Sequence, residues 1–439
     1  MRDIALTLIV GASLLFAIRH TWAGVLLWTW ISVMSPHRLT YGFAYDAPWA
    51  YMTALVTLAS IPIDRKHLHL PRDPALIALA LFVIWVCITT PFAFYPGGSL
   101  DMLIKVLKIQ LMTLIAAVAI RERKHIEYFV WVNALSIGFY GLKGGLFTLR
   151  SGGGERVWGP SGSFIEGNNE VGLAIVAVIP LLNYLRLVST RAWVRLTLLL
   201  TMLLSAVAAL GTQSRGAFLA IAAMGFVMWT RSQRKVVSGI FITIVAVLVI
   251  AFMPASWEAR MYTIDTYRQD SSAMGRINAW WNAIHLANAH FMGGGFDIYR
   301  PDIFEKYAPN PTDVHAAHSI YFQVLGEHGY LGLLLFLAMG AFTILSTMRI
   351  RREAKARAES LWLYHLAGMI QVSMAGFAVG GAFLSLAYFD LPYNIMVMVV
   401  AGTHWLREKR WETETTGAFG SSVPVGRLPR SIAGKAVAP

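Results

Sequence analysis

The chain has 439 residues, of which 56% are hydrophobic and only 14% are charged, so its apolar side chains exceed what the core of a soluble protein requires. Its net charge is +13, and because the basic residues gather in short connections between apolar runs, the positive-inside rule explains them better than nucleic-acid binding does. The runs are continuously apolar rather than alternating, which excludes a transmembrane barrel and leaves membrane-spanning helices.

Three apolar stretches, 3–18, 21–35 and 48–63, precede the first basic connection at Arg65. The first of them follows Arg2 and shows no small-residue cleavage pattern, so we expect it to be retained as a helix. Parity allows two spans with a cytoplasmic N-terminus or three with an external one. We favour two, with one stretch forming a broken or re-entrant segment.

Ten further spans should follow, because basic clusters recur at intervals that let the chain cross the membrane and return. The expected helices cover 74–94, 103–120, 126–148, 169–185, 196–210, 215–230, 236–253, 318–348 and 360–378, and the last returns by about 406. The clusters that mark cytoplasmic connections are Arg65, Lys66 and Arg72; Arg121, Arg123 and Lys124; Arg186, Arg191 and Arg195; Arg231, Arg234 and Lys235; Arg349, Arg351, Arg352, Lys355 and Arg357; Arg407, Lys409 and Arg410. Together with the N-terminal pair this predicts an all-α polytopic protein of about 12 transmembrane helices.

Residues 254–317 form one large polar and aromatic-rich connection, which parity places in the periplasm. We therefore expect a membrane domain over 1–411 that contains this loop, followed by a disordered cytoplasmic tail over 412–439. Internal repeats are not evident, which argues against a secondary transporter. The single cysteine, Cys87, lies in an apolar run, so we expect neither a disulfide nor a thiolate metal cluster.

Several cations break the positive-inside pattern because they lie at the outer ends of the expected spans. They are Lys105, Lys108, Lys143, Arg150, Arg156, Arg215 and Arg276. Lys105 and Lys108 stand three positions apart and share a helical face. Such a set suits an anionic headgroup, because arginine offers a planar fork to phosphate oxygens. The alternative for each residue is that it snorkels to the interface or pairs with membrane lipids.

Two of these arginines stand in distinctive local contexts. Arg215 lies in a tight turn, 211–216, between two apolar helices, where the side chain has little freedom and Gly216 lets a ligand approach the backbone. Arg276 falls in the first turn of an amphipathic helix expected from 274 to 285, where the helix dipole disfavours a cation, so an anionic ligand is indicated. In the same helix, Trp280 suits interfacial packing better than a sugar platform.

His318 stands at the entrance of the expected helix 318–348, whose length makes its first turns project above the membrane. An imidazole beside cations stays neutral and accepts a proton from a sugar hydroxyl. Three alternatives stay open: a hydrogen bond to backbone only, contact with phosphate, and a metal site begun by His315 and Asp313. We expect no metal, because no further carboxylate and histidine set accompanies them.

The segment 158–170 joins an outer connection to an inward helix. Asn168 or Asn169 should cap that helix. Glu166 and Glu170 then remain as carboxylates that could orient an acceptor.

Three short motifs occur in a fixed order along the chain. They are Ser214, Arg215 and Gly216 between two central spans; Gly275, Arg276 and Trp280 at the start of the large loop; and His318, Ser319, Gly326, Glu327, Gly329 and Gly332 at the entrance of the next helix. With their topology, these motifs resemble the O-antigen ligase and polymerase superfamily over about 70–405, nearest to the WaaL-type O-antigen ligases. Some features are also similar to ligases found beside exosortase systems, which leaves the acceptor open.

The resemblance implies a glycosyltransferase of the GT-C type, without metal or cofactor, that moves O-antigen from undecaprenyl pyrophosphate to the lipid A core and completes lipopolysaccharide. By position, Arg215 and Arg276 would hold the pyrophosphate, and His318 would activate the acceptor hydroxyl or assist the pyrophosphate. The residues expected to bind substrate are Lys105, Lys108, Lys143, Arg156, Glu166, Asn169, His315 and Ser319, the last of which is Asn in many relatives. The alternatives are an O-antigen polymerase, a protein O-oligosaccharyltransferase or, in another class, a lipid-linked glycan transporter.

Overall fold

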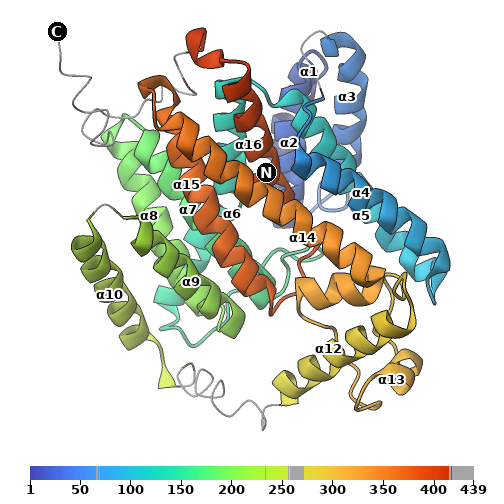
Figure 1. The fold of residues 1–439 in the computed structure, drawn as a ribbon. Helices are drawn as coiled ribbons and strands as arrows, with labels where there is room; N and C mark the ends of the chain where they lie inside the picture. The colour runs from blue at the N-terminus through green and yellow to red at the C-terminus, as the bar shows by residue number, and fades with distance from the viewer. Residues whose placement is uncertain are drawn as a thin grey trace, which may run out of the picture.

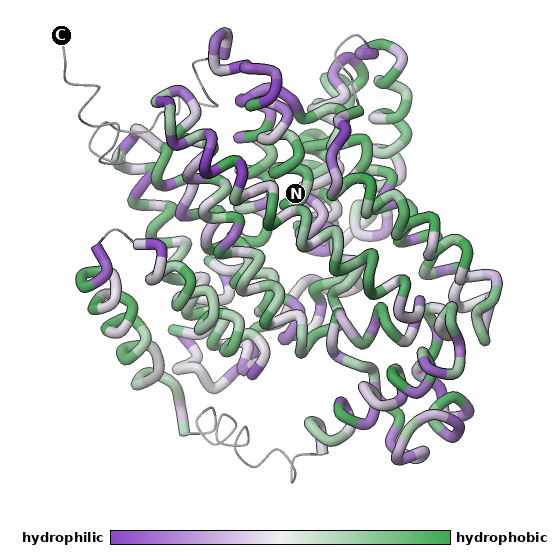
Figure 2. The backbone as a smooth tube through the Cα atoms, in the orientation of Figure 1, coloured by the Kyte–Doolittle hydropathy of each residue, from purple (hydrophilic) through white to green (hydrophobic). Residues whose placement is uncertain are grey.

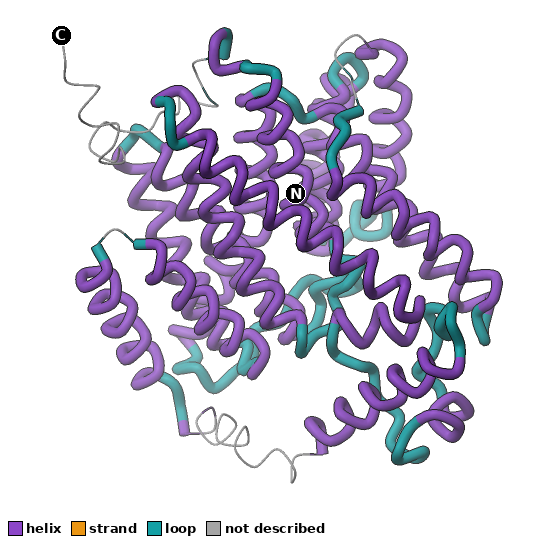
Figure 3. The backbone as a smooth tube through the Cα atoms, in the orientation of Figure 1, coloured by secondary structure: helices purple, strands orange, loops and turns teal. Residues whose placement is uncertain are grey.

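The computed structural model describes residues 1–65, 68, 70–232, 234–255, 257, 271–414 and 417, and every regular element within them is a helix (Figures 1 and 3). The α-helices are α1 (Arg2–Ala17), α2 (Thr21–Met34), α3 (Trp49–Asp64), α4 (Pro74–Thr89), α5 (Pro96–Ala119), α6 (Arg123–Arg150), α7 (Asn168–Val188), α8 (Ala192–Gly211), α9 (Arg215–Arg231), α10 (Lys235–Phe252), α12 (Ser271–Ala289), α13 (Pro301–Tyr307), α14 (Ile320–Ala354), α15 (Leu361–Gly381) and α16 (Asp390–Arg407). Each span expected from the sequence therefore has a helical counterpart. Most of the predicted tail, 412–439, lies outside the described residues, as does 258–270 of the large loop.

Six helical segments of the described chain are long and apolar enough to cross a membrane. They are Pro74–Phe92, Pro96–Ala119, Asn168–Val188, Ala192–Gly211, Ile320–Ala354 and Ala358–Gly381. Hydrophobic residues follow the lengths of the helices, and hydrophilic residues gather toward their ends (Figure 2). The all-helical membrane fold is thus confirmed, whereas the total of twelve spans and the GT-C architecture stay predictions.

The centre of the bundle is α7, which is buried on nearly all sides. A helix that is apolar around its whole circumference belongs inside a bundle, because a surface helix keeps a polar face. It packs against α6, α8, α9 and α15, so the first turns of α7 and α9 are fixed relative to one another.

The connections expected outside the membrane meet at one end of the bundle, which we call the loop end (90–95, 151–167, 212–214, 271–319 and 382–389). The amide of Phe94 donates to the carbonyl of Gly294 at 3.0 Å, and the amide of Val157 donates to the carbonyl of Gly211 at 3.1 Å. Segments far apart in sequence therefore build one surface.

The basic connections meet at the opposite end, which we call the basic end (120–122, 189–191, 232–234, 355–360 and 408–414). There the guanidinium of Arg121 lies 2.7 Å from the carboxylate of Glu408. The guanidinium of Arg407 donates to the carbonyl of Arg72 at 3.2 Å. This separation agrees with the parity argument, since a chain that crosses at each helix must sort its connections to two ends.

The helix expected at 318–348 differs from the observed one in two ways. It begins at Ile320 and continues to Ala354, and Gly329 inside it has non-helical dihedral angles (φ 69°, ψ −172°). The kink admits the segment 293–295: the amides of Gly294 and Gly295 donate to carbonyls of residues 326 and 327, both at 2.9 Å. Only glycine adopts these angles without strain, and a Cβ at Gly329 would stand 2.1 Å from the carbonyl oxygen of Phe291.

Gly329→Ala should therefore lower the free energy of unfolding by at least about 2 kcal/mol, because strain and collision add. Gly340→Ala is the matched control, since Gly340 lies in the same helix and a Cβ there meets no atom within 4 Å. That control should keep or slightly raise stability. Thermal unfolding of both purified variants in detergent measures the difference, and equal melting temperatures would contradict the assigned kink.

Candidate functional site

The turn between α8 and α9 holds Arg215 at the first position of α9. The hydroxyl of Ser214 accepts a hydrogen bond from the amide of Ala217 at 3.2 Å and so caps the helix. Gln213 adopts the left-handed conformation (φ 55°), and its side chain donates to the carbonyls of Gly153 and Gly154 at 3.2 and 3.3 Å. The turn that presents Arg215 is therefore tied to the loop 151–167.

Two more contacts fix this turn at the loop end. The side-chain amide of Asn168 donates to the carbonyl of Thr212 at 2.8 Å, which joins the start of α7 to the turn. The guanidinium of Arg156 donates to the side chain of Gln213 at 3.3 Å. Arg156 therefore lies beside the turn, and its predicted role in substrate binding stays a prediction.

The start of α14 packs against the end of α15, which also contacts the start of α9. A Cβ at Gly381 would stand 2.6 Å from the side chain of Ile320, and a Cβ at Gly216 would stand 3.2 Å from Phe383. The hydroxyl of Tyr321 donates to the carbonyl of Ala378 at 2.8 Å. The starts of α9 and α14 therefore flank the same end of α15, and the positive ends of their dipoles lie at the loop end.

Trp280 on α12 anchors the chain just before His318. Its indole N–H donates to the carbonyl of Ala317 at 2.7 Å, and its ring stacks on Phe322 with centroids 5.0 Å apart. Phe383 lies beside the same ring at 6.5 Å. These contacts assign Trp280 to packing, the favoured interpretation, and bring α12 against α14 and α15.

His318 lies in the turn before α14 in a left-handed conformation (φ 42°), and not in the helix as expected. Burial lowers the pKa of His318 to about 4, and the charges of Arg276 and His315 act in the same direction. The imidazole is therefore neutral at pH 7, because this pH lies above both the lowered pKa and the usual value of 6.5. Its Nδ1 atom and the hydroxyl of Ser319 are buried without a hydrogen bond from any described residue.

Arg276 belongs to the same group of side chains. Its charge acts on both His318 and Glu170, so the guanidinium lies within electrostatic range of the turn before α14 and of the first turn of α7. The described part of α12 already begins at Ser271, so Arg276 lies in the second turn or later and not in the first. The dipole argument for an anionic ligand therefore fails, while the proximity to His318 supports the same assignment.

His315 lies beside this group rather than within it. Its Nδ1 atom is 2.7 Å from the carboxylate of Asp313, and a Cβ at Gly275 would stand 2.7 Å from the same nitrogen. Gly275 thus lets the start of α12 approach the segment that precedes His318, which explains the glycine of the second motif.

Arg276→Gln should raise the pKa of His318 above about 4, because it removes one of the charges that lower this pKa while burial remains. A titration of histidine-labelled protein by NMR, with the signal assigned through His318→Ala, measures the midpoint. Arg300→Gln is the control, because Arg300 pairs with Asp297 and is not among the causes acting on His318. An unchanged midpoint in Arg276→Gln would show that the charge of Arg276 does not act on His318.

Comparison with protein-family models identifies a family for the segment that carries these residues. A family model described as O-antigen ligase matches residues 200–337, which carry Arg215, Arg276 and His318. The match places this segment, residues 200–337, in the O-antigen ligase and polymerase superfamily. A second model, a family of unknown function (DUF5935), matches residues 1–190. A comparison with curated proteins found no match.

Membership in this superfamily makes the chain a glycosyltransferase-like enzyme. Together with the six apolar helices it also makes the chain a multi-pass inner-membrane protein. The match ends inside α14, so the contacts from α7 and α15 to the site come from outside the matched segment.

The structure does not group all of the expected substrate residues with this site. Lys105 and Lys108 are exposed on α5, whose main packing partners are α2, α4 and α16, and Lys143 is exposed on α6. The spacing of basic residues in the sequence predicts that these lysines lie at the outer ends of helices. It does not show which face of each helix packs against the neighbouring helices.

The carboxylate chosen from the sequence also differs from the one that faces the site. Glu166 is exposed and accepts hydrogen bonds from Ser161 and Gly162 at 3.2 and 2.9 Å, so it closes its own loop. Glu170, one helical turn later, is the carboxylate near Arg276. The sequence feature that could have identified Glu170 is its position in the first turn of α7, where an acidic residue complements the helix dipole.

The capping role expected of Asn168 or Asn169 is wrong. Gly167 precedes α7 without a side-chain cap, and the side-chain amide of Asn168 instead donates to the carbonyl of Thr212 in the turn between α8 and α9. Asn169 is half-buried at the start of α7, so its assignment to substrate stays a prediction.

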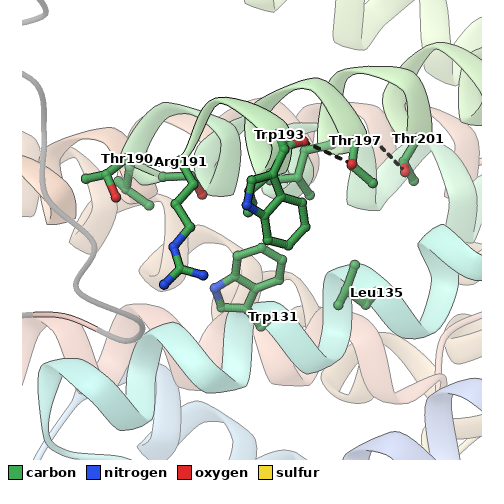
Figure 4. Close-up of a pocket in the computed structure, with 11 residues that line it drawn as sticks. Trp131, Leu135, Thr190, Arg191, Trp193, Thr197 and Thr201 are labelled. Atoms are coloured by element: carbon green, nitrogen blue, oxygen red, sulfur yellow. Dashed lines mark hydrogen bonds between the residues drawn. The ribbon is translucent and has the colours of Figure 1, made fainter.

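An apolar cavity of about 660 Å³ lies away from this site, toward the basic end between α6 and α8 (Figure 4). Arg191 and Trp193 point from the start of α8 toward Trp131 of α6 (Figure 4). Its lining is almost wholly apolar, with Arg191 as its one charged side chain. It therefore offers no grouping of acid, base and cations like that at the loop end.

Proposed function

We propose that the chain transfers O-antigen polysaccharide from undecaprenyl pyrophosphate to the lipid A core, as a WaaL-type O-antigen ligase does. The observation that carries the proposal is the convergence of Arg215, Arg276 and His318 at one end of the bundle, within the segment matched to O-antigen ligase. A second support is Trp280, which ties α12 to the turn that bears His318.

The proposed reaction is a displacement at the anomeric carbon of the donor sugar. The bond from this carbon to the pyrophosphate oxygen breaks, and its electron pair leaves with undecaprenyl pyrophosphate. A new bond forms to the acceptor hydroxyl, whose proton passes to His318. The guanidinium groups of Arg215 and Arg276 stabilise the negative charge that grows on the leaving group, which lowers the barrier.

The neutral state of His318 suits this role, because only an uncharged imidazole accepts a proton. Burial and the nearby charges keep it neutral before substrate binds. A bound pyrophosphate would bring negative charge beside the imidazole and raise its pKa, which favours proton transfer when the donor is in place.

The proposal includes the membrane orientation. If the basic end faces the cytoplasm, the loop end with 254–317 faces the periplasm, where lipid-linked polysaccharide and the lipid A core would meet. The membrane domain would cover 1–411 with about 12 spans, and 412–439 would be a cytoplasmic tail.

A polymerase or a protein O-oligosaccharyltransferase would use the same leaving group and differ only in the acceptor. A lipid-linked glycan transporter is the alternative from another class. A transporter should carry ionisable residues near the middle of the membrane, whereas most charges of this chain gather at the ends of the expected spans. Glu327 and Asp390 are exceptions to be considered, because both are buried within the bundle. Glu327 accepts a hydrogen bond from Tyr388 in the interior and lies only two turns into α14.

Reconstitution with purified components distinguishes these functions. Protein in liposomes would receive radiolabelled lipid-linked donor together with lipid A core, with a second lipid-linked glycan, or with a protein acceptor. A ligase gives labelled lipopolysaccharide only with the core and releases one undecaprenyl pyrophosphate per transfer. Elongated lipid-linked glycan would make the chain a polymerase, and movement of the donor across the bilayer without any product would make it a transporter.

A further inference from the structure

A second cavity of about 770 Å³ lies at the basic end and is lined by parts of α7, α8, α9, α10, α14 and α15. Four arginines line it: Arg186, Arg231, Arg234 and Arg351. They come from three separate regions of the sequence, the end of α7, the end of α9 with its connection to α10, and the end of α14, so folding brings them to one place. Nothing in the proposed glycan transfer uses them, because His318 lies at the other end of α14.

Two of these guanidinium groups converge on one neutral acceptor. Arg231 and Arg351 both donate to the side-chain oxygen of Gln371, the latter at 3.3 Å. Gln371 is itself held by a hydrogen bond of 2.8 Å to Thr347. Arg351 also donates to the hydroxyl of Tyr364 at 3.0 Å, while its Nε–H group is buried and donates to no acceptor among the described residues.

The cavity lining contains no carboxylate, and none of its four arginines forms an ion pair with a carboxylate in the described part of the chain. Other arginines of the basic end do: Arg121 pairs with Glu408, and Arg410 pairs with Glu414 at 2.9 Å. The positive-inside rule explains why arginines occur at this end. It does not explain why four of them share a partly buried cavity, where like charges repel more strongly than in water.

The rest of the lining combines polar side chains, among them Asn183, Ser232 and His365, with apolar ones. The apolar side chains include Leu199 and Met202 of α8, Met228 of α9 and Met369 of α15. A volume of about 770 Å³ falls in the range of small-ligand sites, roughly 300 to 1,000 Å³. A ligand that matches both the arginines and the apolar side chains carries an anionic group and an apolar chain.

We propose that this cavity binds the phosphate group of an anionic membrane phospholipid. Basic pockets between transmembrane helices recognise such headgroups, and the arginine fork matches phosphate oxygens. The phosphate sits between Arg231 and Arg351, Arg186 and Arg234 complete the charge, and the apolar side chains contact the start of an acyl chain. Free inorganic phosphate offers the arginines the same oxygen atoms and is therefore the competing ligand that the test must distinguish from the lipid.

The test measures binding by native mass spectrometry and thermal unfolding of the full-length, delipidated protein. Phosphatidylglycerol, phosphatidylcholine and inorganic phosphate are titrated separately. The variants are Arg231→Gln with Arg351→Gln, and the matched control Arg352→Gln, because Arg352 follows Arg351 in α14 but is exposed and does not line the cavity. Neither readout depends on glycan transfer, so the result is independent of the proposed function.

Phosphatidylglycerol should bind the wild type and Arg352→Gln equally and the double variant at least about tenfold more weakly, since two charge-assisted contacts are lost. Arg234→Gln, a change at an exposed position, should weaken binding less and serves if the double variant does not fold. Protection by inorganic phosphate equal to that by the lipid would assign the site to the free ion. Equal binding of phosphatidylcholine, or equal binding by the double variant, would overturn the proposal.

Discussion

His318→Ala should reduce glycan transfer by about a hundredfold or more while the protein remains folded and membrane-inserted. The imidazole is the neutral side chain beside Arg276, and its Nδ1 atom has no hydrogen bond from a described residue. Its removal should leave the loop-end framework intact, because the turn is held by the indole of Trp280 through the carbonyl of Ala317 and not by the imidazole. Transfer is measured with the reconstituted donor and acceptor, and folding by thermal unfolding.

His285→Ala is the matched control for this change. His285 lies on α12 in the same large loop and is exposed. Its ring forms a hydrogen bond of 2.8 Å with the carbonyl of Tyr307. The control should transfer glycan at the wild-type rate. Transfer at this rate by His318→Ala would remove the imidazole from the reaction, whereas a loss of rate at saturating donor with unchanged donor binding would assign it to the acceptor proton rather than to the pyrophosphate.

Arg215→Gln and Arg276→Gln should each reduce transfer by about 10² to 10³-fold, the usual effect of losing one donor that stabilises a developing anion. Lysine at either position should restore part of the rate, because it keeps the charge but not the planar fork. The two single effects should combine to less than their product if both side chains hold the same pyrophosphate. Rates of undecaprenyl pyrophosphate release measure all of these variants.

Arg150→Gln provides the comparison for these arginine variants. Arg150 ends α6 at the loop end and is exposed, so its loss tests whether any outer cation matters. An equal loss of rate in Arg150→Gln would point to general attraction of an anionic lipid. Wild-type rates in both Arg215→Gln and Arg276→Gln would remove the pyrophosphate role from these residues.

The helices could be predicted from the sequence because the expected spans are long and their boundaries carry charge. The boundaries were less certain where local signals conflict. The helix expected from 103 begins at Pro96, because proline is favoured in a first helical turn. The kink at Gly329 was not predicted, since it is required by the insertion of 293–295, which lies more than 30 residues away in the sequence.

The candidate site could be predicted only where the motif and the local context agreed. Arg215, Arg276 and His318 each stand in a short motif near a turn, and the structure places all three at the loop end. The choice between Glu166 and Glu170 needed the direction of α7, which sequence spacing does not supply. The arginines of the basic end were recognised as a topology signal, but their convergence in one cavity depends on the packing of α7, α9 and α14.

The decisive measurement of the proposed site is a structure of the protein with undecaprenyl pyrophosphate bound. Density for the two phosphates is expected at the loop end, in contact with the guanidinium groups of Arg215 and Arg276 and within hydrogen-bond reach of His318. Phosphate density at the basic end alone, with an empty loop end, would contradict it.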